Sequence, residues 1–281
     1  MNVTIVVLHY ETLSDSAQCL NSIFQLNKQG INLSVVVVDN FSINGKFEKI
    51  KDLYDVYYIK SPKNLGFSCG NNLGIYFAKY NLSPDYVVVV NNDVVFNDSE
   101  FLQKLCENAE NEKADIIGPS IFSPDLKINQ NPIFDLYLDK KKVKGRLIRF
   151  KILKFLLLFN LDVFFQKIYL KLKANNNIHV KDSKDYKLHG ACLIFTKKYL
   201  SQYDGFNPDT FMYFEEDILK YIAERDNLNM VYNPQIELIH KEAASTNYIL
   251  SNNRKKRKFV YVNSIYSLKK LLKLMKQKAN E

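Results

Sequence analysis

The 281-residue sequence predicts an α/β protein with a mostly parallel sheet and helices on both faces. Two β-branched runs, 3–9 and 33–39, are apolar along their whole length, which is typical of strands buried on both faces. Amphipathic stretches of helical length separate such runs, and this alternation predicts parallel neighbours. With 47% hydrophobic and 25% charged residues, the composition excludes a disordered chain.

The predicted elements follow one another in a regular order. Strands are expected at 3–9, 33–39, 56–60, 86–93 and 115–121. Helices are expected from a cap at Ser14 or Asp15 to near Gly30, over 67–80, and from a cap at Asp98 or Ser99 to about Asn111. After a basic and apolar stretch, the expected elements are a strand at 187–196, helices at 197–203 and 214–226, a strand near 229–239 and a basic helix at 252–278. The composition divides the chain into segments 1–125, 126–186, 187–250 and 251–281, of which the second is a basic apolar insertion and the fourth a basic amphipathic helix.

Polar residues follow four of the predicted strands directly. Ligands of open parallel sheets bind at the carboxyl ends of the strands, so these residues favour a nucleotide-type site. They are His9-Tyr10-Glu11, then Asp39-Asn40 with Ser42, then residues 62–67, and then Asn91-Asn92-Asp93. Neither a GxGxxG after the first strand nor a GxxxxGK[ST] is present, which disfavours dinucleotide dehydrogenases and P-loop NTPases. A divalent cation, Mg²⁺ or Mn²⁺, held by Asp93 could bridge the oxygens of a diphosphate instead.

Five motifs occur together in this chain. They are VVDNFS (37–42), NLGFSCGNNLGI (64–75), YVVVVNNDVVF (86–96), HGACLIF (189–195) and FMYFEEDIL (211–219). With them the sequence resembles the family 2 glycosyltransferases of the GT-A fold, in their rhamnosyltransferase-like branch. The resemblance implies an inverting, metal-dependent enzyme that moves a sugar from a nucleotide-diphosphate donor to a saccharide acceptor. It also implies a role on a lipid-linked acceptor in bacterial surface polysaccharide assembly, such as O-antigen or capsule.

The resemblance makes segment 1–125 the nucleotide-sugar-binding half and segment 187–250 the acceptor-side catalytic half, and it implies roles for individual residues. Asp39 holds the nucleotide base, Tyr10 and Glu11 line the same pocket, and Asn64 with Gly66 closes it. Asn91, Asn92 and Asp93 stand at the family's DxD position, where only the third residue is acidic. The metal ligands are then Asp93 and His240, and the acceptor pocket contains His189, Gly190 and Ala191.

The acidic triplet at 215–217 resembles the ED motif that supplies the catalytic base. Direct displacement requires a carboxylate that takes the proton of the attacking hydroxyl. Alignment on ED favours Asp217, whereas an ungapped match places Glu216 at this position. Successive helical residues point about 100° apart, so the two cannot face the acceptor equally.

The positive charge lies in the second half of the chain. Residues 136–281 carry 29 Lys and Arg against 14 acidic residues, a net charge of +15. The stretches 140–173 and 254–278 are both basic and apolar, so we expect them either to lie on an anionic membrane or to pack on the protein with a solvated basic face. The apolar run between Lys154 and Asp162 is seven residues long, well short of the roughly 20 residues that span a bilayer. We expect a cytoplasmic protein at the inner face of the cell membrane.

Two other functions remain open at this stage. The cationic half is compatible with nucleic-acid binding, although no binding motif accompanies it, and we expect no nucleic-acid partner. Another α/β nucleotide enzyme, such as a nucleotidyltransferase, is the second alternative. The glycine-rich basic loop of that class is absent, because an acidic segment, HYETLSDS, follows the first strand.

Overall fold

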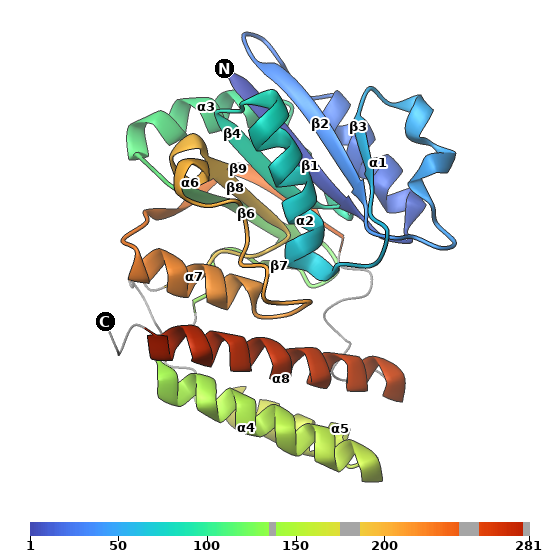
Figure 1. The fold of residues 1–281 in the computed structure, drawn as a ribbon, viewed down its shortest axis with the longest axis vertical. Coiled ribbons are helices and arrows are strands. Elements are labelled where there is room, and N and C mark those ends of the chain that lie inside the picture. Colours follow the sequence, from blue (N-terminus) through green and yellow to red (C-terminus); the bar gives the residue numbers. More distant parts are fainter. Residues whose placement is uncertain (135–138, 175–185, 242–252, 278–281) are drawn as a thin grey trace.

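The computed structural model describes residues 1–134, 139–174, 186–241 and 253–277 and has a mixed α/β fold (Figure 1). Within these ranges one nine-stranded sheet forms the centre, in the order β3-β2-β1-β4-β8-β6-β9-β5, with β7 paired to β6. The strands are β1 (Asn2–His9), β2 (Asn32–Asp39), β3 (Tyr57–Lys60), β4 (Tyr86–Asn91), β5 (Val94–Val95), β6 (Ile116–Ser123), β7 (Ile128–Asn129), β8 (Cys192–Thr196) and β9 (Met230–His240).

The sheet is parallel in its first half and mixed in its second. Strands β3, β2, β1 and β4 run parallel to their neighbours, as the sequence predicted. Strand β8 is inserted antiparallel between β4 and β6, and β5 pairs antiparallel with β9. In the second half β6 and β9 also run parallel, and the antiparallel partners are β8, β5 and β7. The direction of these three strands could not be predicted, because an apolar run indicates burial but not strand direction. The one sheet joins strands from segments 1–125 and 187–250.

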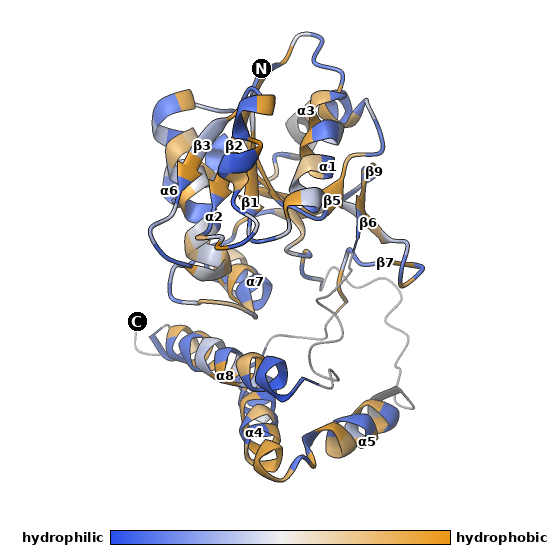
Figure 2. Ribbon diagram, turned by 90° about the vertical axis from the view of Figure 1, so that its right-hand side faces the viewer, coloured by the Kyte–Doolittle hydropathy of each residue, from blue (hydrophilic) through white to orange (hydrophobic). Residues whose placement is uncertain are grey.

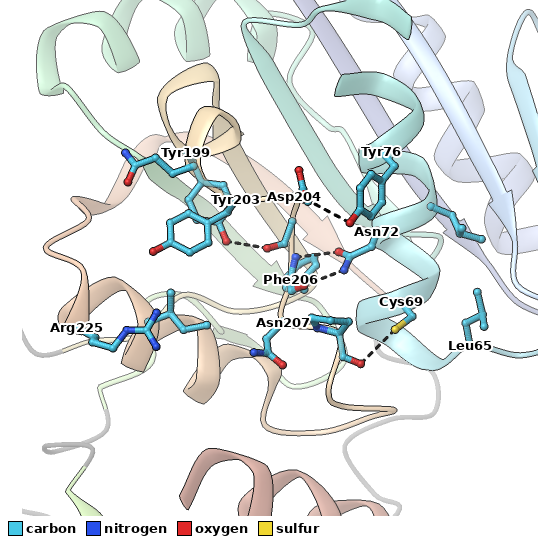
Figure 3. A pocket seen from close by; sticks show the side chains of 15 residues that line it. Leu65, Cys69, Asn72, Tyr76, Tyr199, Tyr203, Asp204, Phe206, Asn207 and Arg225 are labelled. Atoms are coloured by element: carbon cyan, nitrogen blue, oxygen red, sulfur yellow. Dashed lines mark hydrogen bonds between the residues drawn. The ribbon is translucent and has the colours of Figure 1, made fainter. Parts of the chain in front are cut away.

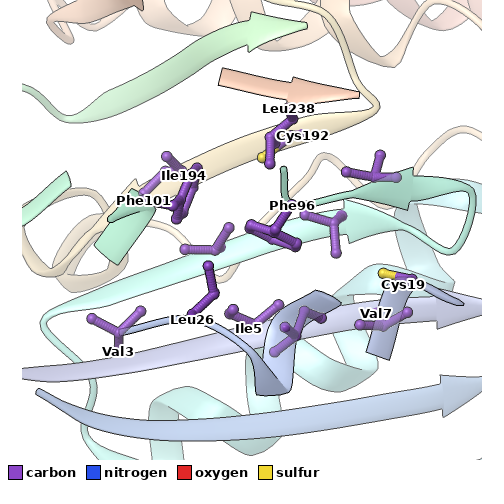
Figure 4. Close-up of a cluster of buried hydrophobic side chains, with 14 of the residues drawn as sticks. Val3, Ile5, Val7, Cys19, Leu26, Phe96, Phe101, Cys192, Ile194 and Leu238 are labelled. Carbon is purple, nitrogen blue, oxygen red and sulfur yellow. The ribbon is translucent and has the colours of Figure 1, made fainter. Parts of the chain in front are cut away.

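Helices cover both faces of the sheet. On one face, α1 (Leu13–Phe24) and α3 (Phe101–Glu112) pack on Val3, Ile5 and Val7 of β1 (Figure 4). On the other face, α2 (Gly66–Phe77), α6 (Lys197–Gln202) and α7 (Glu215–Arg225) pack around Val6. This alternation along β1 follows from the two-residue period of a strand. Short helices connect these elements: η1 (Phe47–Lys49), η2 (Lys51–Leu53) and η3 (Ala78–Leu82).

A further helical layer lies beyond α7. It contains α4 (Lys140–Leu156), η4 (Leu157–Phe159), α5 (Asp162–Ala174) and α8 (Arg254–Gln277). Helices α4 and α8 pack on each other and on α7 through a separate apolar cluster that includes Phe150, Ile218 and Leu268. In Figure 1 this layer lies beneath the edge of the sheet at which β1 and β2 end. Within the described residues, no helix is long and apolar enough to cross a membrane.

Candidate active site

The loop after β2 is held by the two acidic residues predicted to bind the nucleotide. The carboxylate of Asp39 accepts hydrogen bonds from the backbone N–H groups of Ser42 (2.8 Å) and Phe47 (3.1 Å). The carboxylate of Glu11 accepts three more, from residues 43–45. These backbone hydrogen bonds, that of Ile43 first, hold the pKa of Glu11 below its ordinary value. Asp39 and Glu11 thus shape the loop at the carboxyl ends of β1 and β2, beside the exposed ring of Tyr10.

A buried histidine supports this loop from below. His9 Nε2 lies 2.6 Å from the carbonyl oxygen of Gly45, and Nδ1 lies 2.6 Å from Ser16 Oγ. Burial lowers the pKa of His9, which favours the neutral ring. His9 is therefore a structural residue of the loop.

Asn40, directly after β2, joins the end of this strand to the segment between β3 and α2. Its Oδ1 accepts a hydrogen bond from the N–H of Leu65 (2.9 Å), and its Nδ2 donates to the carbonyl oxygen of Gly66 (3.0 Å) and to Asn64 Oδ1 (3.3 Å). Gly66 has a φ of 76°, and a Cβ atom at this position would lie 2.0 Å from the carbonyl oxygen of Phe211. Asn64 and Gly66 therefore lie together as predicted. Asn40 is the residue that joins them, and its place directly after Asp39 was the signal for it.

Asp93 and His240 meet where β5 pairs with β9. Their atoms Oδ1 and Nε2 are 3.3 Å apart, and the other ring nitrogen of His240, Nδ1, lies 2.8 Å from Oε1 of Gln130. Among the described residues, Asp93 Oδ1 is buried without a hydrogen-bond partner. An amide oxygen on Nδ1 fixes the ring tautomer so that Nε2 presents its lone pair toward Asp93. A divalent cation fits between the buried Asp93 Oδ1, which lacks a hydrogen-bond partner among the described residues, and the lone pair of His240 Nε2.

Among the described residues, no third His, Cys, Asp or Glu side chain joins the two predicted metal ligands. In the described ranges no group of three or more His, Cys, Asp or Glu side chains could hold a metal ion. A cation at Asp93 and His240 would therefore complete its shell with oxygens of the donor and of water, as Mg²⁺ and Mn²⁺ commonly do. Gln130 was not predicted as a site residue. It directly follows β7, and only the fold brings it to His240.

Asn91 and Asn92 connect this pair to the rest of the site. The N–H of Asn91 donates to the carbonyl oxygen of Ala191 (3.0 Å). The side chain of Asn92 donates to the hydroxyls of Thr12 (2.8 Å) and Ser16 (2.9 Å). These contacts fix the segment before Asp93 between the start of α1 and the segment before β8.

The structure separates the two candidates for the catalytic base. Asp217 is 2% exposed, and its two oxygens lie 2.7 Å from Arg146 Nη1 and 2.5 Å from Lys187 Nζ. Glu216 points elsewhere, and its Oε1 accepts a hydrogen bond from the N–H of Gly190 (3.2 Å). Because both oxygens of Asp217 already face cations in the interior, this carboxylate is poorly placed to receive a hydroxyl proton.

The predicted acceptor residues join Glu216 to the metal pair. His189 lies beside His240, with ring centroids 5.7 Å apart, and Gly190 contacts Glu216. A continuous series of contacts thus runs from Asp93 through the two histidines and Gly190 to Glu216. The fold gathers these residues from the ends of β4 and β9, the segment before β8 and the start of α7.

Glu215 is the buried member of the acidic triplet. Burial first, and then the neighbouring carboxylate of Glu216, raises its pKa to about 8. Among the described residues its Oε1 has no hydrogen-bond partner. Glu215 is therefore protonated at neutral pH and is a structural residue at the start of α7.

A cavity of about 570 Å³ lies elsewhere, between α2 and the segments around α6 and α7 (Figure 3). At its wall, Asn72 makes two hydrogen bonds to the backbone of Phe206, and Cys69 Sγ donates to the carbonyl oxygen of Pro208 (3.3 Å). Of the residues that the sequence places at the strand ends, only Leu65, in the stretch 62–67, is among those that line this cavity. The candidate active site is instead the open region at the strand ends.

The α/β fold, with polar residues gathered at the carboxyl ends of its strands, agrees with the predicted class of nucleotide-binding transferases, and comparison with known proteins makes the class specific. The model of the family "Glycosyl transferase family 2" matches residues 4–178, which is more than half of the chain. The chain therefore belongs to glycosyltransferase family 2 and is a glycosyltransferase, as the sequence motifs indicated.

Relatives and solved structures agree with this assignment. The low-salt glycan biosynthesis hexosyltransferase Agl10 of Haloferax volcanii is 25% identical over 275 residues, which cover 95% of this chain and 77% of Agl10. The mannosyltransferase PcManGT from Pyrobaculum calidifontis, solved with GDP-Man and Mn²⁺, has a TM-score of 0.54 at 12% identity, covering 96% of this chain and 69% of its own. TarS of S. aureus has a TM-score of 0.54 at 13% identity and 94% coverage of this chain. The present chain spans 43% of that TarS chain. These structures share the GT-A fold with this protein.

Proposed function

We propose that this glycosyltransferase is an inverting, metal-dependent enzyme that transfers a sugar from a nucleotide-diphosphate donor to a saccharide acceptor. The observation that carries the proposal is the series of contacts from Asp93 and His240 through His189 and Gly190 to Glu216. It supports a cation site at Asp93 and His240 and a base at the partly exposed Glu216, on either side of the residues expected to line the acceptor pocket.

The donor nucleotide is assigned to the strand ends of the parallel half. The exposed ring of Tyr10 is available to pack on a base, and Asp39 and Glu11 organise the surrounding loop. Asn64 and Gly66 border the same region through Asn40. Solved structures of this fold have been obtained with GDP-Man in PcManGT and with UDP in TarS, which supports a nucleoside diphosphate as the ligand class.

Asp93 and His240 are the residues that would hold the Mn²⁺ or Mg²⁺ ion. When bound, such an ion neutralises the negative charge that develops on the leaving diphosphate. Asn92 holds the segment of Asp93 against α1, and Gln130 orients the ring of His240. The PcManGT structure contains Mn²⁺, which supports a divalent ion here.

Glu216 is the general base of this proposal, and Asp217 is a positioning residue. Glu216 would take the proton of the acceptor hydroxyl as this oxygen attacks the anomeric carbon and the diphosphate leaves from the opposite side. The N–H of Gly190 orients its carboxylate. The ion pairs of Asp217 with Arg146 and Lys187 fix α7 so that Glu216, about 100° away around the helix, faces the acceptor region.

The acceptor is proposed to be a lipid-linked saccharide at the cytoplasmic side of the membrane, in surface polysaccharide assembly. Support comes from the name of Agl10, a hexosyltransferase of glycan biosynthesis, and from the basic apolar helices of this chain.

A transfer assay with two isosteric variants tests the assignment of the base. Glu216→Gln should lower transfer by roughly 10²- to 10⁴-fold, the usual contribution of a positioned base. Donor binding, measured by calorimetry, should change little because the base acts on the acceptor. Asp217→Asn is the comparison variant. Because Asp217 acts only by holding α7 in position, this variant should lower transfer per folded molecule by less than about tenfold, far less than the loss of the base. Wild-type transfer by Glu216→Gln, or a product that retains the anomeric configuration, would contradict the mechanism.

A further inference from the structure

The C-terminal helix is not the free amphipathic surface that its sequence suggested. Leu268, Leu271 and Met275 of α8 are buried in the cluster that α8 forms with α4 and α7. Its basic residues, apart from the buried Arg257, form the outer side of a packed helix. If the chain has a membrane-binding surface, most of it must lie elsewhere.

The α4–α5 hairpin, residues 140–174, exposes an unusual number of large apolar side chains. Each of the following is between 38% and 62% exposed: Ile148, Ile152, Phe155, Leu158, Phe159, Leu161, Phe164, Phe165, Ile168, Tyr169, Leu170 and Leu172. Soluble proteins rarely leave so many large apolar residues exposed on one short segment unless the surface has a partner.

The exposed apolar side chains are arranged most regularly on α5. Its side chains at 164, 165, 168, 169 and 172 recur at helical spacing and are all exposed. Among its described side chains, only those of Asp162 and Gln166 are buried. Figure 2 shows α5 to the side of α4, at the end of the molecule that lies away from the sheet.

The hairpin is held in this position by a buried ion pair. Asp162, at the start of α5, accepts hydrogen bonds from Arg257 Nε (2.7 Å) and from the hydroxyl of Tyr261 (2.9 Å), both on α8. Both charged side chains are almost fully buried. The exposed apolar residues that follow are therefore presented by a fixed turn.

The charge of the hairpin identifies the chemistry of its partner. Residues 140–172 carry ten Lys and Arg and a single acid, Asp162, which is paired with Arg257. Exposed lysines such as Lys151, Lys154 and Lys167 lie on the same helices as the apolar side chains. Two identical surfaces of this charge would repel each other, which disfavours a second copy of the chain as the partner.

We propose that the α4–α5 hairpin is a membrane-binding element that places its apolar side chains in the interfacial region of an anionic lipid bilayer. Apolar insertion together with cationic contacts to lipid headgroups is the physical basis of such binding. The hairpin lies beyond the sheet edge that carries the candidate active site (Figures 1 and 2). This placement would bring the site to a lipid-linked acceptor, and that consequence alone rests on the proposed function.

Vesicle flotation with the full chain tests the proposal without any transfer assay. The chain should float with vesicles of phosphatidylcholine and phosphatidylglycerol and bind phosphatidylcholine alone much more weakly. Leu158→Ser combined with Phe164→Ser should lower binding at least about tenfold, since both side chains would be removed from the lipid. Leu53→Ser with Tyr80→Ser is the matched control, because these residues are equally exposed on other parts of the molecule, and it should bind normally.

Charge and self-association are examined in the same experiment. Lys167→Gln with Lys171→Gln should weaken binding to anionic vesicles, whereas Lys28→Gln with Lys113→Gln should not. Native binding by the Leu158→Ser/Phe164→Ser variant, or no vesicle binding by the native chain, would overturn the proposal. So would a native dimer that dissociates in this variant, since a second copy would then be the partner. Vesicle binding by a chain without transferase activity would contradict only the proposed function.

Discussion

Replacing Glu215 by glutamine should stabilise the protein in a pH-dependent way. The pKa of this carboxyl rises from 4.5 to about 8 on folding, mainly because it is buried. Between these values the unfolded chain has released a proton that the folded chain still binds, so folding stability falls as the pH rises from about 4.5 to about 8. This loss of folding stability is absent below about pH 4.5 and complete above about pH 8.

The size of the loss in folding stability follows from the shift in the pKa of Glu215. At about 1.36 kcal/mol per pH unit, the shift corresponds to an upper limit of roughly 5 kcal/mol at pH 8. Glutamine keeps the shape without an ionisable proton, so Glu215→Gln should gain little at pH 4.5 and about 2 to 5 kcal/mol at pH 8 relative to the native protein.

Urea denaturation of both proteins across this pH range measures the difference. Asp125→Asn is the control, because Asp125 is an exposed acid away from α7. Its effect should be below about 1 kcal/mol at every pH. A difference between Glu215→Gln and the native protein that is the same at pH 4.5 and pH 8 would refute the reasoning.

Three further substitutions test the packing around the site. Asp217→Asn should lower the free energy of unfolding by roughly 2 to 4 kcal/mol, because it removes the buried charge that faces Arg146 and Lys187, while transfer per folded molecule stays within about tenfold of native. A fall by orders of magnitude would instead make Asp217 the base. Asp162→Asn should cost about 3 kcal/mol in urea denaturation by breaking its pair with the buried Arg257, and an unchanged midpoint would argue against the fixed turn. Gly66→Ala should reduce nucleotide binding by calorimetry, since its Cβ would meet the backbone of Phe211, and native affinity would contradict the close approach.

The sequence predicted the parallel half of the fold closely. The runs at 3–9, 33–39, 56–60 and 86–93 form β1 to β4, because continuous β-branched stretches are stable as buried strands. The direction of β8 could not be predicted, since it depends on pairing with β4 and β6. The packing of α8 was also open, because an amphipathic pattern is the same for a helix on a membrane and a helix on a protein core.

In the site, too, some residues could be predicted from local motifs, whereas the roles of others depend on contacts between distant segments. Asp93 and His240 could be proposed from motifs, and the fold places them 3.3 Å apart. The choice between Glu216 and Asp217 required the fold, because Arg146 and Lys187 come from distant segments. Gln130 and its contact with His240 had no signal in the sequence for the same reason.

The central claim, that the strand ends around Asp93 bind a nucleotide together with a divalent ion, is tested most directly by calorimetry. GDP and UDP are titrated into the native protein and into Asp93→Ala, with and without Mn²⁺, and Asp125→Asn serves as the control at an exposed acid outside the site. At least one nucleotide should bind the native protein and the control more tightly with Mn²⁺, by about tenfold or more. Asp93→Ala should fold normally and lose this dependence on the metal. Equal Mn²⁺ dependence in Asp93→Ala and the native protein, or no binding of either nucleotide to the native chain, would contradict the account.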